Sequence, residues 1–340
     1  MIVVENLSKH FKRKPAVTDL SFEVPDGTIT GFLGPNGSGK STTFQCMLGL
    51  IRPTAGRVIW RGADYEGEFP ALANKHRVAG ALLDAQWADP KRSGRDHLRV
   101  IARGAGISDT RVEECLDMVG MTDVADTRIG KYSLGMKQRI HVAAALLGDP
   151  QHYIFDEPVN GLDPEGVNWV RQMMQQLAAS GRSVIVSSHL LSEMQITAKR
   201  LVVIGQGQLI GQYSMDEFLA QGQSITVESP EIQRLHSLLN MPGRVEQQTL
   251  HLTGVHDEAG VRQRIAEVAL ENGILITQLA TASGNLEAEF LRLTAGAQEY
   301  RTRGAGESGI RAQATPGKQQ VERMQEPQHR MLHNGFGEDK

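Results

Sequence analysis

A glycine-rich segment that ends in lysine and serine is the first feature of the sequence that could do chemistry. Residues 34–42 read GPNGSGKST and fit the pattern G-x-x-x-x-G-K-[ST], after the strand-like run TITGFL and before a helical run. Glycines let the backbone fold tightly with its N–H groups inward, and the helix adds a positive dipole end. We expect Lys40 to contact the β- and γ-phosphates of a nucleotide and the Ser41 hydroxyl to coordinate Mg²⁺. The alternative, a glycine-rich turn without a ligand, is disfavoured by the complete strand, loop and helix.

Two acidic residues, Asp156 and Glu157, close the apolar run HYIFDEP. Successive side chains on a strand point opposite ways, so the two can serve different tasks at the sheet edge where ligands bind in open α/β sheets. We expect Asp156 to hold Mg²⁺ through water and Glu157 to polarise the water that attacks the γ-phosphate. Without a phosphate loop in the sequence, the pair would be interpreted as solvated acids at the start of a loop. Beside a phosphate loop, the chemical interpretation is favoured.

A histidine, His189, ends a second apolar run, SVIVSSH, at the same predicted edge. Its position suits contact with the γ-phosphate or the attacking water. The chain has 11 histidines, so a structural or exposed histidine stays open as the alternative.

The stretch KYSLGMKQR, residues 131–139, resembles a helix entrance built to hold a phosphate. Ser133, Gly135 and the helix formers suit that role, whereas the bulk of Leu134 does not obviously suit it. A damaged binding motif, a working variant and an ordinary helix start are the three interpretations.

The elements that must position these residues suggest an α/β fold. Residues 1–215 alternate short strand-like and helical runs, and strand signals stop over about residues 93–130, which predicts a helical insert. Residues 223–297 follow the order βαββαβ and a final helix, which suits a small ferredoxin-like module. Residues 298–340 are polar and rich in Gly, Gln, Arg and Glu, and we expect them to be mostly disordered.

Composition sets the broad class of the protein. The chain has 340 residues, 40% of them hydrophobic and 22% charged, which predicts a soluble globular protein. The net charge of −3 gives no general argument for nucleic-acid binding. The two cysteines, Cys46 and Cys115, are far apart, so a disulfide framework or a cysteine metal cluster is not expected and a reducing compartment fits. No run reaches the ~18 apolar residues of a membrane span.

The set and order of these motifs resemble the ATP-binding subunits of ABC transporters, most closely the stand-alone ATPases that pair with ABC-2-type export permeases. The resemblance covers roughly residues 1–215, and residues 285–294 resemble less specifically the last helix of that subgroup's C-terminal extension. The implied fold is an ABC-type P-loop NTPase domain with a mixed sheet core, an antiparallel β-subdomain and a helical insert, followed by a small α+β domain.

The resemblance assigns roles position by position. Phe11 occupies the place of an aromatic that stacks on adenine, although a core residue remains the alternative. Glu157 and His189 match the catalytic base and the switch histidine, and Ser41 and Asp156 match the metal site. The remaining nucleotide contacts that it implies are Gly34, Pro35, Asn36, Gly37, Ser38, Gly39, Lys40, Thr42, Ser133, Gly135 and Asp163.

Two departures from the family pattern stand out. In VAGALLDAQW, Asp84 occupies the best-aligned position of the glutamine that senses Mg²⁺ and the transporter, and Gln86 lies two residues on. We prefer Asp84, which can bind a metal or its water shell but cannot donate a hydrogen bond when ionised. Leu134 replaces the first signature glycine. Because the hydroxyl, the remaining glycine and the helix end survive, we interpret the segment as a working variant in which Leu134 alters dimer closure.

The resemblance also implies how the protein works. Two subunits, expected as a homodimer, would sandwich two ATP molecules with Mg²⁺, and their opening and closing would drive a separate integral-membrane permease of ABC-2 type. The subunit would then lie in the cytoplasm at the inner face of the cell membrane, held there by its permease. A soluble ABC-type ATPase that acts on ribosomes or DNA, or as a regulatory or immunity switch without a permease, is the alternative. The exported substrate is not encoded in these motifs.

Overall fold

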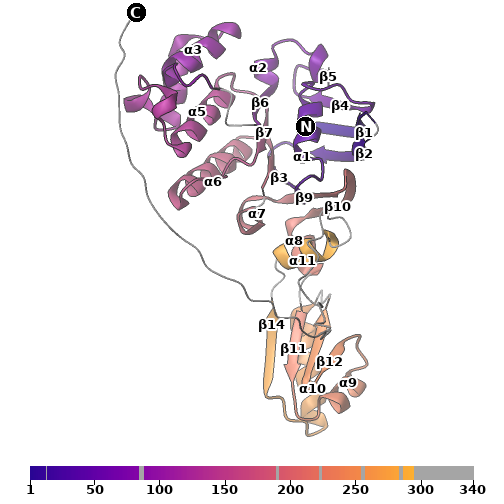
Figure 1. Ribbon diagram of the computed structural model, residues 1–340. Helices are drawn as coiled ribbons and strands as arrows, with labels where there is room; N and C mark the ends of the chain where they lie inside the picture. The colour runs from indigo at the N-terminus through magenta and orange to yellow at the C-terminus, as the bar shows by residue number, and fades with distance from the viewer. Residues whose placement is uncertain are drawn as a thin grey trace, which may run out of the picture. The chain divides into compact units, whose positions relative to one another are not determined.

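A six-stranded, largely parallel sheet forms the centre of the first domain (Figure 1). The computed structural model describes residues 1–12, 14–83, 88–188, 191–221, 224–253, 257–282 and 286–294. The strand order is β10-β9-β3-β8-β7-β6, and only β10 pairs antiparallel. The strands are β3 (Ile29–Leu33), β6 (Ala79–Leu82), β7 (His152–Asp156), β8 (Ser183–Ser187), β9 (Arg200–Gly205) and β10 (Gln208–Ser214).

The central strands of this sheet are buried from end to end. Every residue of β3, β7 and β8 is buried, and for β7 and β8 this agrees with the apolar runs HYIFDEP and SVIVSSH. β9 and β10 form an antiparallel hairpin. Since β3, β7 and β8 run parallel, their carboxyl ends, and the residues that follow them, meet at one edge of the sheet.

A second, antiparallel sheet has the order β2-β1-β4-β5. Its strands are β1 (Ile2–Phe11), β2 (Lys14–Val24), β4 (Ala55–Arg61) and β5 (Glu66–Glu68). Residues of these strands share a hydrophobic core with α1 (Lys40–Met47) and with one face of the parallel sheet, where the rings of Phe22, Phe32 and Phe44 stack in sequence. This core holds β2 against the loop that precedes α1.

Helices cover the other face of the parallel sheet, where they share a second core (Figure 1). The predicted insert is helical, with α3 (Gly94–Gly104), α4 (Asp109–Met118) and 3₁₀ turns at Thr122–Val124 and Ile129–Lys131. The other helices of this domain are α2 (Lys75–Val78), α5 (Leu134–Leu146), α6 (Pro164–Ala179), α7 (Leu191–Thr197) and α8 (Met215–Gln221), with a 3₁₀ turn at Phe69–Ala71. Within the described ranges, no helix combines the length and apolar character that crossing a membrane requires.

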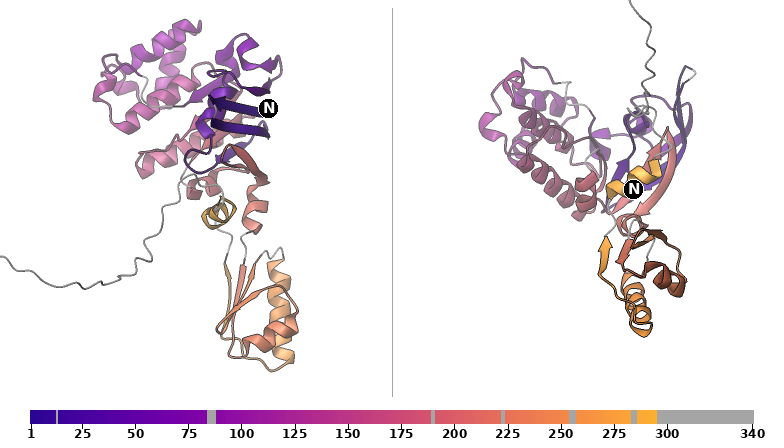
Figure 2. Two further views of the ribbon diagram at one scale, coloured as in Figure 1. Left: turned by 45° about the vertical axis from the view of Figure 1, so that its right-hand side comes forward. Right: turned by 60° about the horizontal axis from the view of Figure 1, so that its bottom comes forward.

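Residues 224–282 form an antiparallel sheet with a core of its own. The elements are β11 (Ser224–Glu228), α9 (Ile232–Leu239), β12 (Arg244–Glu246), β13 (Thr249–Thr253), α10 (Glu258–Glu271) and β14 (Gln278–Ala282). The strand order β12-β13-β11-β14 and the two helices on one face (Figure 2) confirm the predicted ferredoxin-like arrangement. The final helix, α11 (Leu286–Thr294), contributes Leu286 to the core that α7 and α8 share. The predicted tail, residues 298–340, lies outside the described residues.

A buried polar cluster lies at the amino-terminal edge of the parallel sheet, away from the strand ends discussed below. The Nδ1 atom of His152, the first residue of β7, is hydrogen-bonded to the Ser183 hydroxyl, which donates to Asp26 at 3.0 Å. The imidazole also packs edge-on against Trp60, with ring centroids 5.4 Å apart. Burial lowers the pKa of His152 to about 4, so the ring is neutral in the folded protein at neutral pH.

This cluster predicts a pH-dependent stability. Because the pKa of His152 is about 4 when folded and 6.5 in the unfolded chain, the unfolded state binds more protons between these values. The free energy of unfolding should therefore be unaffected by this group above pH 6.5 and fall by about 3 kcal/mol as the pH drops to 4. Denaturant unfolding as a function of pH should show a shallower dependence in His152→Gln. The exposed control His10→Gln should keep the wild-type slope, and an equal slope in all three proteins would contradict the account.

Candidate active site

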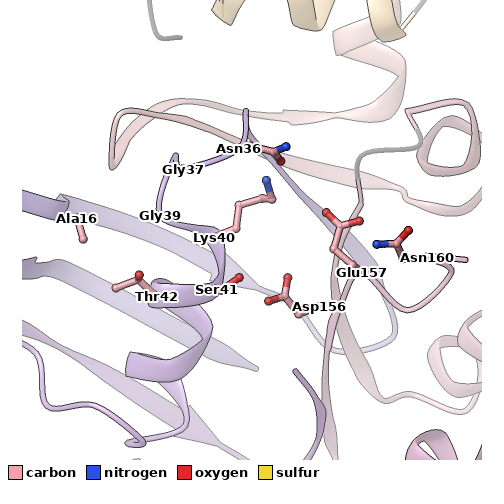
Figure 3. A pocket seen from close by; sticks show the side chains of 10 residues that line it. All are labelled: Ala16, Asn36, Gly37, Gly39, Lys40, Ser41, Thr42, Asp156, Glu157 and Asn160. Atoms are coloured by element: carbon pink, nitrogen blue, oxygen red, sulfur yellow. The ribbon is translucent and has the colours of Figure 1, made fainter. Parts of the chain in front are cut away.

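A cavity of about 560 Å³ lies where the predicted phosphate loop meets the carboxyl end of β7 (Figure 3). In the close-up, the carboxylates of Asp156 and Glu157 point toward the loop, and the Ser41 hydroxyl faces Asp156. The structure thus brings together residues more than 100 positions apart in the chain. The lining residues are Ala16, Asn36, Gly37, Gly39, Lys40, Ser41, Thr42, Asp156, Glu157 and Asn160.

The observed conformation of the loop requires glycine at two positions. Gly39, at the N-cap of α1, has φ +101°, and a Cβ atom there would lie 2.5 Å from the carbonyl oxygen of Ala16. Gly34 lies so close to Ile204 that a Cβ atom would be 2.8 Å from its carbonyl oxygen. The close contacts hold the loop around the start of α1, with Asn36 and Gly37 exposed and Ser38 buried. The cradle and the helix end suit an anion such as a phosphate.

Lys40 supplies the positive charge of the cavity. Its ammonium group is mostly buried and donates hydrogen bonds to the carbonyl oxygens of Gly34 at 2.7 Å and Pro35 at 3.3 Å. Burial lowers the pKa of Lys40, and the negative charges of Glu157 and Asp156 oppose that shift. One cation and two carboxylates therefore share one polar cavity, which suits a ligand that carries both phosphate and a divalent metal.

The carboxylate pair is held by the neighbouring strand. Asp156 is 7% exposed and accepts a hydrogen bond from the Ser187 hydroxyl at the end of β8. The backbone N–H of Glu157 donates to the same hydroxyl oxygen at 3.0 Å, and Glu157 has a left-handed backbone with φ 53°. Ser187 was not among the predicted site residues. The only signal for it was its place two residues before His189 in the same apolar strand.

The segment 131–139 starts a helix, as predicted. Ser133 is the N-cap of α5, and its hydroxyl accepts a hydrogen bond from the Met136 N–H at 3.2 Å. Leu134 is 49% exposed, and its Cδ2 atom lies 2.3 Å from the position that a Cβ atom on Gly161 would take. Ser133 and Gly135 do not line the Lys40 cavity of their own chain.

The start of α5 is attached to the segment that follows Glu157. A Cβ atom on Gly135 would lie 3.6 Å from Leu162, and the buried Gln138 donates a 2.7 Å hydrogen bond to the carbonyl oxygen of Pro158. With the contact between Leu134 and Gly161, these interactions tie the helix entrance to residues 158–162. The leucine therefore has a packing partner inside the same chain.

The remaining predicted residues lie apart from the cavity or outside the described ranges. Phe11, at the end of β1, is 49% exposed, with the Lys9 ammonium 5.2 Å from its ring centroid, so it is not a core residue. Asp163 is the N-cap of α6 and accepts a hydrogen bond from the Gly166 N–H at 3.0 Å. Asp84, Gln86 and His189 lie outside the described residues.

Comparison with known proteins gives consistent matches. Residues 17–160 match the family model described as ABC transporter. The chain is 32% identical to an uncharacterized ABC transporter ATP-binding protein, YhcH, of Bacillus subtilis (strain 168), over 88% of this chain and 97% of YhcH. It is 31% identical to the bacitracin transport ATP-binding protein BcrA of Enterococcus faecalis, over 87% of this chain and 97% of BcrA. The fold resembles that of the ATP-binding cassette MJ0796, solved as a dimer in a post-hydrolysis state with ADP and Pi. The TM-score is 0.57, at 20% identity over 63% of this chain and 99% of that one.

The loop geometry predicts that Gly39→Ala impairs the site, whereas a matched change elsewhere does not. Gly181 also has a positive φ, +85°, but a Cβ atom there would meet nothing within 4 Å. Gly39→Ala and Gly181→Ala should both lose about 1–2 kcal/mol of stability to the left-handed backbone. Only Gly39→Ala should lower ATP turnover, on the order of 100-fold, because the loop must shift by about 1 Å away from Ala16. Steady-state ATPase assays with thermal unfolding test this, and equal turnover in the two variants would contradict it.

Proposed function

We propose that this chain, which belongs to the ATP-binding proteins of ABC transporters, hydrolyses ATP as a dimer to drive a separate membrane export permease. The observation that carries the proposal is the shared cavity of Lys40, Ser41, Asp156 and Glu157, in which a phosphate cradle faces two carboxylates. That arrangement supplies both the binding and the proton-transfer groups that phosphoryl transfer to water needs.

The phosphate loop provides the ground-state binding. The backbone N–H groups at the start of α1 and the Lys40 ammonium neutralise the phosphate oxygens, and Lys40 exchanges its carbonyl partners for them. Ser41 and Asp156 would hold Mg²⁺, which would supply positive charge against the phosphates. The oxygen donors that face each other in Figure 3 fit that ion.

Glu157 acts on the attacking water. Its backbone is fixed at the strand end by Ser187, and its side chain points into the cavity toward the loop. A carboxylate in this place accepts a hydrogen bond from the attacking water. It thereby aligns the water oxygen with the γ-phosphorus atom. His189, Asp84 and Phe11 keep the roles that the family resemblance implies: contact with the γ-phosphate, sensing of the metal and stacking on adenine.

A second copy of the chain completes each site. Ser133 caps α5 at a surface that does not line the Lys40 cavity of its own chain. Its hydroxyl, together with the positive end of α5, suits the γ-phosphate of ATP bound to the partner subunit. Two chains arranged head to tail about a two-fold axis would then clamp two ATP molecules.

The permease is a separate chain in this proposal. BcrA, which shares 31% identity over most of the chain, is by name a bacitracin transport ATP-binding protein. Export of a similar kind, through a permease of ABC-2 type, places this subunit at the inner face of the cell membrane. The substrate is then selected mainly by the permease.

The mechanism predicts that Glu157→Gln stops turnover without abolishing ATP binding. Turnover should fall by at least about 100-fold, because the amide cannot accept the proton of the attacking water. The variant should accumulate as an ATP-bound dimer, visible by size-exclusion chromatography with light scattering. Glu165→Gln, at an exposed acid in the first turn of α6, is the control and should behave as wild type. Unchanged turnover in Glu157→Gln would remove Glu157 as the base.

The export proposal predicts membrane association that depends on a partner. The subunit should sediment with membranes when its permease is co-expressed and stay in the supernatant when the permease gene is deleted. Affinity purification from detergent-solubilised membranes, followed by mass spectrometry, should recover a polytopic membrane protein. Recovery of ribosomes or DNA in its place would overturn the export proposal.

A further inference from the structure

Ser187 is the last residue of β8 and is completely buried. It lies beside Asp156 in the parallel pairing of β7 and β8. Its neighbours at this point are the two carboxylate residues of the cavity, although its side chain does not line the cavity itself.

The donors and acceptors of the Ser187 hydroxyl determine which hydrogen bonds it makes. A hydroxyl has one proton to donate and two lone pairs that accept. The proton goes to Oδ1 of Asp156 at 2.5 Å, and the oxygen accepts from the Glu157 N–H at 3.0 Å. The result is a continuous chain from the Glu157 amide through the hydroxyl to the Asp156 carboxylate, in which each bond strengthens the next.

The backbone of Glu157 is the part of this arrangement that needs support. A left-handed conformation, φ 53°, costs a residue with a side chain about 1–2 kcal/mol and persists where its surroundings determine it. The Glu157 N–H donates to two oxygens of Ser187, the hydroxyl oxygen at 3.0 Å and the carbonyl oxygen at 3.2 Å. One serine thus holds both the backbone of Glu157 and the carboxylate of Asp156.

We propose that Ser187 is a positioning residue for ATP hydrolysis, which fixes Asp156 and Glu157 relative to each other so that the metal and the attacking water are aligned. This inference rests on the proposed function of the site. The role of the Ser187 hydroxyl is to act through its two partners, Asp156 and Glu157, and not by direct contact with ATP. Because the Ser187 side chain is completely buried, it is not exposed to a ligand in the cavity.

The same strand provides a matched control. Ser183, at the other end of β8, is also completely buried, and its hydroxyl donates to a carboxylate, that of Asp26, at 3.0 Å. It lies at the opposite edge of the sheet and does not contact the cavity. A purely structural role of a buried serine on β8 would therefore give similar effects for Ser183→Ala and Ser187→Ala.

The experiment compares binding of a fluorescent ADP analogue with and without Mg²⁺ in the full-length chain, alongside ATP turnover and thermal unfolding. Ser187→Ala should keep the metal-free ADP affinity, since the phosphate loop is unchanged. It should reduce the Mg²⁺-dependent gain in affinity and the kcat by about 10- to 100-fold, as changes behind a metal ligand do. Ser187→Thr, which keeps the hydroxyl, should recover most of both. Ser183→Ala should lower the unfolding temperature only.

Two results would overturn the inference: a wild-type Mg²⁺ effect in Ser187→Ala, or an equal loss in Ser183→Ala. If Ser187→Ala does not fold, Ser187→Cys provides the same comparison, because the thiol keeps the shape but is a weak donor. If the wild-type protein hydrolyses ATP and Ser187→Ala hydrolyses it at the same rate, only this inference is contradicted. A wild-type protein that neither binds nor hydrolyses ATP contradicts the proposed function.

Discussion

The structure depends on one constraint, the parallel alignment of β3, β7 and β8, which brings the ends of three distant chain segments to one edge of a sheet. β3 leads into the phosphate loop, β7 ends at Asp156 and β8 ends at Ser187. All three strands are buried on both faces, so a shift in register would disrupt close packing against both cores. The hydrophobic cores on both faces of the sheet therefore fix the geometry of the cavity.

Two residues at this edge of the sheet have a left-handed backbone. They are Gly39, in the phosphate loop, and Glu157, which directly follows β7. Close packing of Ala16 against the loop and the hydrogen bonds of Ser187 hold these conformations. The cost is offset by the buried sheet, which leaves the site organised before a nucleotide binds.

The same edge of the sheet is linked to the start of α5 within one chain. Residues 158–162 follow Glu157 directly, and Leu134 and Gln138 attach the start of α5 to them. If α5 contacts the ATP of the partner subunit, the loop beside Glu157 responds to that contact. The leucine that departs from the family pattern is then part of the connection between the two sites of the dimer.

Much of this arrangement could be predicted from local sequence. The apolar runs before Asp156 and His189 predicted buried parallel strands, and the run before Gly34 predicted a strand. The glycine spacing predicted the cradle. All these signals lie within a few residues of one another. Ser187 and the contact of Leu134 with Gly161 could not be predicted. Both depend on pairs of residues about 30 positions apart, and an isolated serine or leucine carries no sign of its partner.

The packing of helix α11 could not be predicted from local sequence either. Its sequence predicted a helix, and its place in the chain suggested the end of the small domain. Its apolar face instead joins the core that α7 and α8 share, and only the folded chain shows this.

The central claim, that the loop of one subunit and the Ser133 helix of another form each ATP site, is tested most directly by mixing two defective subunits. One carries Lys40→Ala and the other Ser133→Arg, both in a Glu157→Gln background so that bound ATP is retained. Retention of radiolabelled ATP in a dimer is then measured after rapid gel filtration. The account predicts none with either subunit alone and clear retention in the mixture, where one pairing restores an intact site. No retention in the mixture, or retention by the Ser133→Arg subunit alone, would contradict it.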